Sequence, residues 1–143
     1  MVMKHCIVAL SSTLHRFARE FLERQLKENG LKGIVPSHGD ILASLYQKQT
    51  LTMQELACRI NRTKATTTVL VDKLEKLELV SRVKSEKDSR VYLVSLTVKG
   101  KSYEQLFNQI AENMNSRLMN NLSEDEANLL EKLLTKAISG FNK

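Results

Sequence analysis

Apolar residues recur every three or four positions along most of this chain, and this helical spacing is interrupted only between residues 80 and 96. In that stretch, residues 80–85 and 91–96 are rich in β-branched and apolar side chains, and the polar run 86–90 separates them. Two such runs around a charged turn predict a β-hairpin. The sequence therefore predicts a mainly helical protein that contains a single hairpin.

Long amphipathic helices are predicted at both ends of the chain. The first covers residues 4–29, where an apolar stripe runs from Ile7 to Phe21. Two more follow the hairpin, one from about Thr97 and one from Ser123. Their stripes resemble a coiled-coil seam and hold more apolar surface than one small module needs to bury. They predict a dimer with interlocking termini, and burial against each other within one chain is the alternative.

Three shorter helices precede the hairpin. Ser37, Thr52 and Thr63 are predicted to begin them as N-caps, because each side chain can accept a hydrogen bond from the first helical turn. Only Asn61 and Arg62 separate the second of these helices from the third. That spacing is typical of a helix-turn-helix.

The charge of the chain is unevenly distributed. Lys and Arg number 22 and Asp and Glu 16, for a net charge of +6. Residues 51–99 hold 10 basic and 6 acidic side chains, whereas residues 100–143 hold 5 and 6. A basic middle favours an anionic partner, nucleic acid first. A solvated surface of mixed charge accounts for the charge alone equally well.

The start of the third short helix has the residue types of a DNA-reading helix. Such a helix must place small or hydrogen-bonding side chains in a major groove about 12 Å wide. Methyl groups suit thymine, hydroxyls suit phosphates or bases, and Arg62 and Lys64 supply charge. Three successive threonines are also poor helix formers. A capped helix with a solvated face is the alternative. The candidate DNA-binding residues are Arg62, Thr63, Lys64, Ala65, Thr66, Thr67 and Thr68.

The hairpin tip provides a second candidate contact. An arginine at the end of a β-hairpin suits a narrow, electronegative minor groove, and Asp88 can orient Arg90 through a charge-assisted hydrogen bond. An ordinary exposed turn is the alternative. The candidate residues are Lys84, Lys87, Asp88, Ser89 and Arg90. A helix-turn-helix followed by such a hairpin predicts a winged helix-turn-helix core, flanked by long N- and C-terminal dimerisation helices.

The hairpin also resembles a known family. Residues 88–100 are similar to the D-x-R…v-x-L-T-x-x-G wing signature of the MarR-type transcription regulators, and element order and length match over essentially the whole chain. Residues 51–57 resemble that family's third helix, residues 71–77 the end of its recognition helix, and residues 79–82 the start of its wing. Two positions depart from the pattern: Glu78 replaces a usual glycine, and Val69 stands where many members carry a polar residue.

The resemblance implies a homodimer bound to a pseudo-palindromic operator of double-stranded DNA, usually as a repressor. It implies one domain over residues 1–143, with dimerisation helices at 1–33 and 101–143 around a DNA-binding lobe at 34–100. It also implies release from DNA by a small-molecule effector or an oxidant. Cys6 weakly resembles the sensing cysteine of the peroxide-responsive branch, although residues 35–38 lack the tyrosine of that branch, and a plain apolar cysteine is the alternative. The ligand cleft would be lined by Phe17, Phe21, Tyr46 and Met53, each of which core packing explains equally well.

Other functional classes find less support in the sequence. It has no Gly-rich phosphate loop, Gly-x-Ser-x-Gly or Cys-x-x-Cys motif, so we predict neither an enzyme nor a cofactor. His5, His15 and His38 lack the spacing of metal ligands. No apolar run approaches the roughly 20 residues that span a bilayer, no signal peptide is evident, and two cysteines favour a cytoplasmic protein. A helical protein-interaction module is the alternative, although it leaves the basic middle unexplained.

Overall fold

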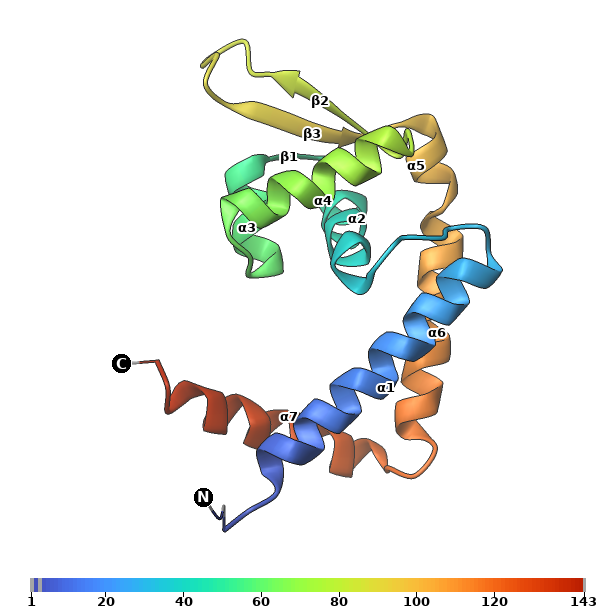
Figure 1. The fold of residues 1–143 in the computed structure, drawn as a ribbon, viewed down its shortest axis with the longest axis vertical. Helices are drawn as coiled ribbons and strands as arrows, with labels where there is room; N and C mark the ends of the chain where they lie inside the picture. Colours follow the sequence, from blue (N-terminus) through green and yellow to red (C-terminus); the bar gives the residue numbers. More distant parts are fainter. Residues whose placement is uncertain (1, 3, 143) are drawn as a thin grey trace. The chain divides into compact units, whose positions relative to one another are not determined.

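The computed structural model describes residues 2 and 4–142, and its helices and strands follow the predicted order, with one added strand and one predicted helix divided in two (Figure 1). By their internal contacts, the residues form two compact units, Met1–Ile110 and Ala111–Lys143. The division into a DNA-binding lobe and dimerisation helices stays a prediction. The elements are α1 (Ile7–Glu28), α2 (Pro36–Lys48), β1 (Thr50–Thr52), α3 (Met53–Ile60), α4 (Lys64–Lys76), β2 (Val80–Lys84), β3 (Tyr92–Leu96), α5 (Val98–Ser102), α6 (Glu104–Met119) and α7 (Glu124–Ser139).

A three-stranded antiparallel sheet contains the predicted hairpin, with the strand order β1-β3-β2. In the hairpin, Arg82 of β2 pairs with Val94 of β3. The added strand β1 pairs with the other edge of β3, where Leu51 faces the same Val94. A strand of three residues is too short to show a period of two, and its partner lies far along the chain, so the sequence pattern does not reveal it.

Side chains from α2, α3, α4 and the sheet form the core of the first unit. Ile41, Leu45, Leu56, Leu74 and Val94 are fully buried in it. Burying each side chain of this size stabilises the fold by about 1.5–3 kcal/mol relative to leaving it in water. This packing fixes α3 and α4 against the sheet, which positions the predicted helix-turn-helix beside the hairpin.

The capping boxes confirm two of the predicted helix starts. Thr52 accepts a hydrogen bond from the Glu55 N–H at 3.1 Å, and the Glu55 carboxylate accepts one from the Thr52 N–H at 2.8 Å. Ser123 and Glu126 make the same reciprocal pair at the start of α7. Each pair satisfies two backbone donors that the first helical turn leaves open.

The predicted N-cap of α2 is wrong. The helix begins at Pro36 rather than after Ser37, and Val35 occupies the N-cap position. The buried imidazole of His38 reaches back, and its Nδ1 accepts a hydrogen bond from the Val35 N–H at 2.9 Å. The imidazole thus takes the part that the acidic residue plays in a capping box, because it satisfies the backbone donor of the N-cap residue.

The helices that follow the hairpin differ from the prediction in one respect. The single long helix expected from Thr97 is divided at Tyr103 into a short α5 and a longer α6. Ile110 of α6 and Leu26 of α1 are buried in the core of the first unit. Among the described residues, no helix combines the length and the apolar character needed to cross a membrane.

Candidate nucleic-acid interface

The turn between α3 and α4 is built by backbone hydrogen bonds. Asn61 ends α3 in the left-handed conformation, with φ at 54°, which asparagine tolerates better than most residues. The Arg62 N–H donates to the carbonyl of Ala57 at 3.0 Å. Thr63 then begins α4, and its hydroxyl accepts from the Thr66 N–H at 3.2 Å, as predicted for an N-cap. These bonds set the direction in which α4 leaves the turn.

The helix α4 buries one face and exposes the other. Val71 and Leu74 are fully buried, and so is Thr67, whose hydroxyl donates to the carbonyl of Thr63 at 2.8 Å. The prediction that Thr67 faces DNA is therefore wrong, because its side chain packs inward with the core residues of the same face. The remaining predicted residues stay accessible: Arg62, Thr63, Lys64, Ala65 and Thr66 are exposed, and Thr68 is half-buried.

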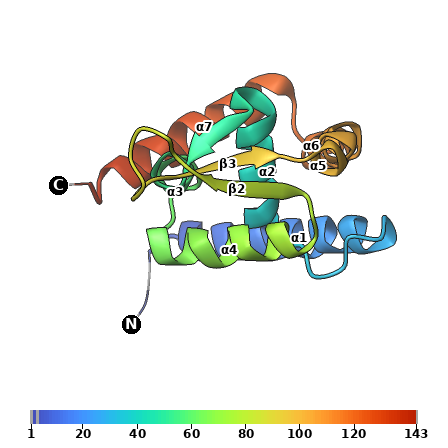
Figure 2. The same cartoon turned by 90° about the horizontal axis from the view of Figure 1, so that it is seen from above.

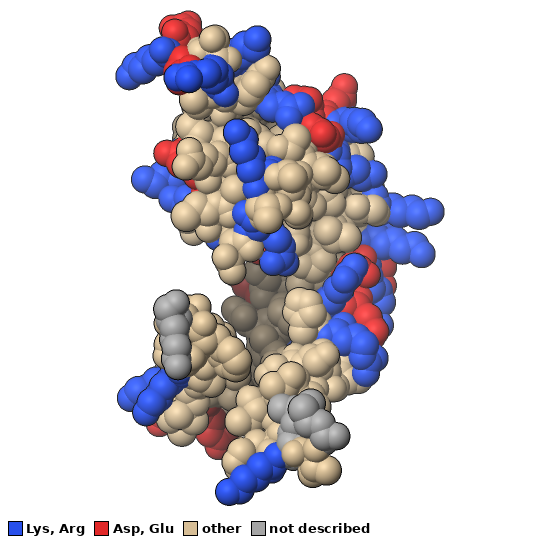
Figure 3. Space-filling model, turned by 60° about the vertical axis from the view of Figure 1, so that its left-hand side comes forward, with Lys and Arg blue, Asp and Glu red and all other residues tan. Residues whose placement is uncertain are grey.

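The hairpin and the start of α4 lie at the same end of the first unit. Figures 1 and 2 show, in two perpendicular views, that the tip between β2 and β3 extends toward the end of the unit where α3 gives way to α4. Figure 3 shows lysine and arginine side chains at this tip and over the lobe beneath it, with fewer acidic side chains among them. The two predicted contact elements thus share one end of a predominantly basic lobe.

Asp88 and Arg90 form a two-point ion pair at the hairpin tip. Arg90 Nε lies 3.1 Å from Asp88 Oδ1, and Arg90 NH2 lies 3.3 Å from Oδ2. The Arg90 side-chain hydrogen bond, followed by that of its backbone N–H, lowers the pKa of Asp88 below its ordinary value. The predicted Asp88–Arg90 bond is therefore present. The Arg90 side chain remains 89% exposed, which leaves it available to a groove, and Lys84, Lys87 and Ser89 are exposed beside it.

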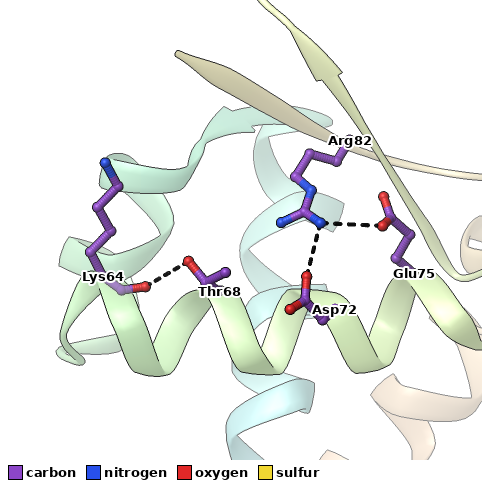
Figure 4. Close-up of polar contacts among 5 residues, drawn as sticks. All are labelled: Lys64, Thr68, Asp72, Glu75 and Arg82. Atoms are coloured by element: carbon purple, nitrogen blue, oxygen red, sulfur yellow. Dashed lines mark hydrogen bonds and ion pairs between the residues drawn. The ribbon is translucent and has the colours of Figure 1, made fainter. Parts of the chain in front are cut away.

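Arg82 joins the hairpin to α4 (Figure 4). Its NH2 lies 2.9 Å from Asp72 Oδ1 and 3.4 Å from Glu75 Oε1. Its guanidinium carbon also stands 5.8 Å from the ring centre of Tyr92. Arg82 is not among the site residues predicted from the sequence, because its partners lie on another element. These contacts engage its charge inside the lobe and hold β2 against the helix.

The end of α4 is attached to the segment that follows the hairpin. Glu78, in place of the usual glycine, has a left-handed φ of 61°, and its carbonyl accepts a hydrogen bond from the Thr97 hydroxyl at 2.6 Å. Lys99 Nζ donates to the carbonyl of Leu77 at 3.0 Å. Gly100 is required here, because a Cβ on it would lie 2.0 Å from the carbonyl oxygen of Leu79. The glycine of the wing signature thus has a steric reason.

Comparisons with known proteins agree with this geometry. The MarR family model matches residues 34–92, which run from α2 to the hairpin. YkoM, an uncharacterized HTH-type transcriptional regulator of Bacillus subtilis, is 30% identical over 124 residues, which cover 85% of this chain and 80% of YkoM. The chain belongs to the MarR family. Its relatives are transcription regulators, and like them this MarR-family protein is not an enzyme.

Two further proteins are similar to this MarR-family chain. The HTH-type transcriptional repressor MdtR of Bacillus subtilis is 30% identical over 99 residues, which cover 69% of this chain and 61% of MdtR. The crystal structure of a mutant E. coli MarR complexed with operator DNA has a TM-score of 0.82 at 24% identity and covers 92% of both chains. That likeness supports the winged helix-turn-helix fold.

The predicted ligand-lining residues are divided between two places. Met53 is buried in the core, and the half-buried Tyr46 packs against that core. The Tyr46 hydroxyl donates to the Gly100 carbonyl at 2.8 Å, and burial, with the nearby Glu104 carboxylate, raises the pKa of Tyr46 to about 12. Phe17 and Phe21 belong to α1 and lie outside the core cluster. Packing therefore accounts for Met53 and Tyr46.

Both cysteines are free and exposed. Cys6 occupies the N-cap position of α1, and its side chain makes no capping hydrogen bond. Cys58 lies on the outer side of α3, where its side chain is exposed. It lines a surface pocket of about 450 Å³ together with Lys48, Thr50, Leu51, Glu55 and Arg59, and none of the four predicted ligand residues contributes to that pocket.

Proposed function

We propose that this MarR-family regulator binds double-stranded DNA through the start of α4 and the hairpin tip. The first turns of α4 would enter the major groove, and Arg90 would enter the adjacent minor groove. One observation carries the proposal: the exposed start of α4 and the exposed guanidinium lie at the same end of one rigidly packed lobe. The operator DNA in the similar MarR structure supports the same reading.

The proposal includes a homodimer. On α1, the side chains of Ile7, Leu10 and Phe17 are more than half exposed, and so are those of Leu129 and Leu133 on α7. Contiguous apolar stripes of this kind are a feature of interaction surfaces. We assign residues 1–33 and 101–143 to dimerisation and residues 34–100 to DNA binding. Two-fold symmetry would then place half-sites about 34–36 Å apart on a pseudo-palindromic operator.

The proposed mode of action is repression, with release by a small ligand or an oxidant. The name of MdtR supports a repressor. An exposed Cys6 is compatible with thiol oxidation, and a Cys6→Ser variant that retains a full oxidant response would remove Cys6 from the mechanism. We expect the protein to act in the cytoplasm, where two free cysteines stay reduced.

The experiment that tests DNA binding starts with selection of bound fragments from a random duplex pool. Affinity for the recovered duplex is then measured over a series of salt concentrations. A protein that contacts phosphates releases counterions, so affinity should fall steeply as salt rises. Replacing Arg90 with alanine should weaken binding by about 1–3 kcal/mol if the guanidinium reads the groove.

Lys32→Ala is the matched control. It also removes one exposed positive charge, and the loop that carries Lys32 lies at the opposite end of the first unit from the hairpin tip in Figures 1 and 2. Its affinity should stay near that of the natural protein. Equal losses for Arg90→Ala and Lys32→Ala would mean that general charge, and not the hairpin, holds the DNA. No enrichment of any duplex would reject the proposed function.

A further inference from the structure

The outward face of α4 is apolar over its first two turns. Ala65 is exposed, and Val69 is 68% exposed. The two residues are four positions apart, so they lie one above the other on the same face. The fully buried Thr67, Val71 and Leu74 occupy the other side of the helix. The apolar pair therefore stands where a groove-reading helix presents its side chains.

The threonine hydroxyls near this pair are already engaged within the helix. Thr68 donates its hydroxyl to the carbonyl of Lys64 at 2.9 Å, as Figure 4 shows. The Thr63 hydroxyl accepts from the Thr66 N–H and donates to the Thr66 hydroxyl at 3.0 Å. The hydroxyl protons of Thr63 and Thr68 are therefore used within the chain's own turn and helix. Thr68 thus offers a partner its methyl group and an acceptor oxygen, and no donor.

Other side chains that recognise bases through hydrogen bonds are scarce on α4. The helix contains no Arg, Asn or Gln, and of the side chains that most often read guanine and adenine it offers only lysines. Its outward carboxylate, Asp72, is held by Arg82. Positive charge stands at the helix start, where Arg62 and Lys64 are exposed and suited to phosphates. The helix therefore carries charge to hold the DNA and methyl groups to meet the bases.

We propose that α4 recognises thymine through its C5-methyl group, with Ala65 and Val69 as the contacting residues. This inference depends on the proposed DNA binding and adds the chemical feature that is read. Thymine alone presents a methyl group in the major groove of unmodified DNA, and apolar side chains are its natural partners. The recovered half-sites should accordingly hold thymine at the positions that face these two residues.

Deoxyuridine tests the proposal, because it differs from thymidine only in lacking the C5-methyl. Thymines of the duplex selected above are replaced one at a time, and affinity is measured for each duplex. Loss of one buried methyl contact should weaken binding about fourfold per half-site, given roughly 0.8 kcal/mol per buried methylene. At least one position in each half-site should show this loss, and the other thymines should show none.

A Val69→Ala variant tests whether Val69 is the residue that contacts the thymine methyl group. The variant should bind the thymine duplex about as weakly as the natural protein binds the deoxyuridine duplex. Replacing the same thymine with deoxyuridine should then lower the affinity of the variant little further, because both changes remove the same contact. Val98→Ala is the control, since Val98 is also exposed, at 86%, and lies on α5. Circular dichroism checks that each variant is folded.

The outcomes separate this inference from the proposed function. Salt-dependent duplex binding that no deoxyuridine replacement alters would overturn methyl reading and leave DNA binding intact. A Val69→Ala loss that simply adds to the loss from deoxyuridine would also overturn it, because Val69 would then act elsewhere, as on a protein partner. Failure to select any duplex would instead reject the proposed function itself.

Discussion

Glu78 adopts a backbone conformation that suits glycine. Its φ of 61° brings the Cβ of an L residue close to the backbone, at a cost of roughly 1–2 kcal/mol. The hydrogen bond from Thr97 to its carbonyl, the Lys99 bond one residue earlier and the core packing around Leu79 keep the chain in this turn. Glu78 therefore keeps the turn conformation that a glycine would adopt, at the cost of local backbone strain.

Glu78→Gly should raise the free energy of unfolding by up to about 1 kcal/mol, because glycine adopts positive φ freely but also gains entropy when unfolded. Urea titration measures the change. Glu78→Ala is the matched control, since it removes the carboxylate and keeps the strain, and it should give no comparable gain. If both variants are stabilised equally, the carboxylate and not the backbone is responsible.

His38 makes stability depend on pH. Burial lowers the pKa of His38, and the positive charge of Lys73 on α4 lowers it further. The folded protein therefore binds this proton less readily than the unfolded chain, whose histidine has a pKa of about 6.5. The contribution is present above that pH and is lost as the pH falls below it, because a protonated Nδ1 no longer accepts the Val35 N–H.

The urea concentration at the unfolding midpoint should accordingly decrease as the pH is lowered from about 7.5 to about 5.5. Most carboxylates stay ionised over this range. His38→Asn is the comparison, because its amide oxygen can accept a backbone hydrogen bond without titrating. Its midpoint should change less over the same window. Parallel pH curves for the two proteins would assign the effect to other groups.

Features of the helices that depend on neighbouring residues were predictable from the sequence. Features that depend on contacts between distant elements were not. Thr52 and Thr63 are predictable as caps because their partners lie within one helical turn. The inward position of Thr67 was missed, since three successive threonines look alike until the core defines a face. The start of α2 is not predictable from a cap pattern, because the N-cap residue Val35 has no side-chain atom that accepts a hydrogen bond.

The contacts in the candidate site show the same difference between local and long-range features. The Asp88–Arg90 pair was predictable because its partners are two residues apart. The contact of Arg82 with Asp72 was not, since it requires β2 to lie against α4. The surface position of Cys58 likewise follows only from the way α3 packs. Sequence thus predicted the order of elements and the hairpin tip, and tertiary packing decided which side chains of α4 are accessible.

Arg82 should couple the hairpin to α4 energetically. A double-mutant cycle of Arg82→Gln with Asp72→Asn, measured by urea unfolding, should give an interaction energy of about 0.5–1 kcal/mol, because the pair is only partly shielded from water. The cycle of Arg82→Gln with the exposed Glu86→Gln is the control and should give none. Strict additivity for both cycles would mean that the ion pair does not hold the hairpin.

The exposed apolar side chains on α1 and α7 form the surface that we propose for dimerisation. Leu133→Asp places a charge in the α7 stripe and should shift the protein from dimer toward monomer, as sedimentation velocity would show. Affinity for the selected duplex should fall with it, since a monomer holds only one half-site. Folding of the lobe should persist, because its core lies in the first unit.

Asn128→Asp adds the same charge to α7 outside the exposed leucines and is the control. It should leave the sedimentation coefficient unchanged. A monomeric natural protein at micromolar concentration, or a dimer that tolerates Leu133→Asp, would contradict the assignment of α7 to dimerisation.

The exposed Ala65–Val69 pair on α4 has a consequence for cells that modify their genomes. 5-Methylcytosine presents its methyl at the same place on the pyrimidine ring as thymine does, although it sits in a C·G pair. A helix that meets methyl groups, and makes few hydrogen bonds to tell the two pairs apart, would accept both. Cytosine methyltransferases would then create or strengthen binding sites for this regulator without changing the base sequence.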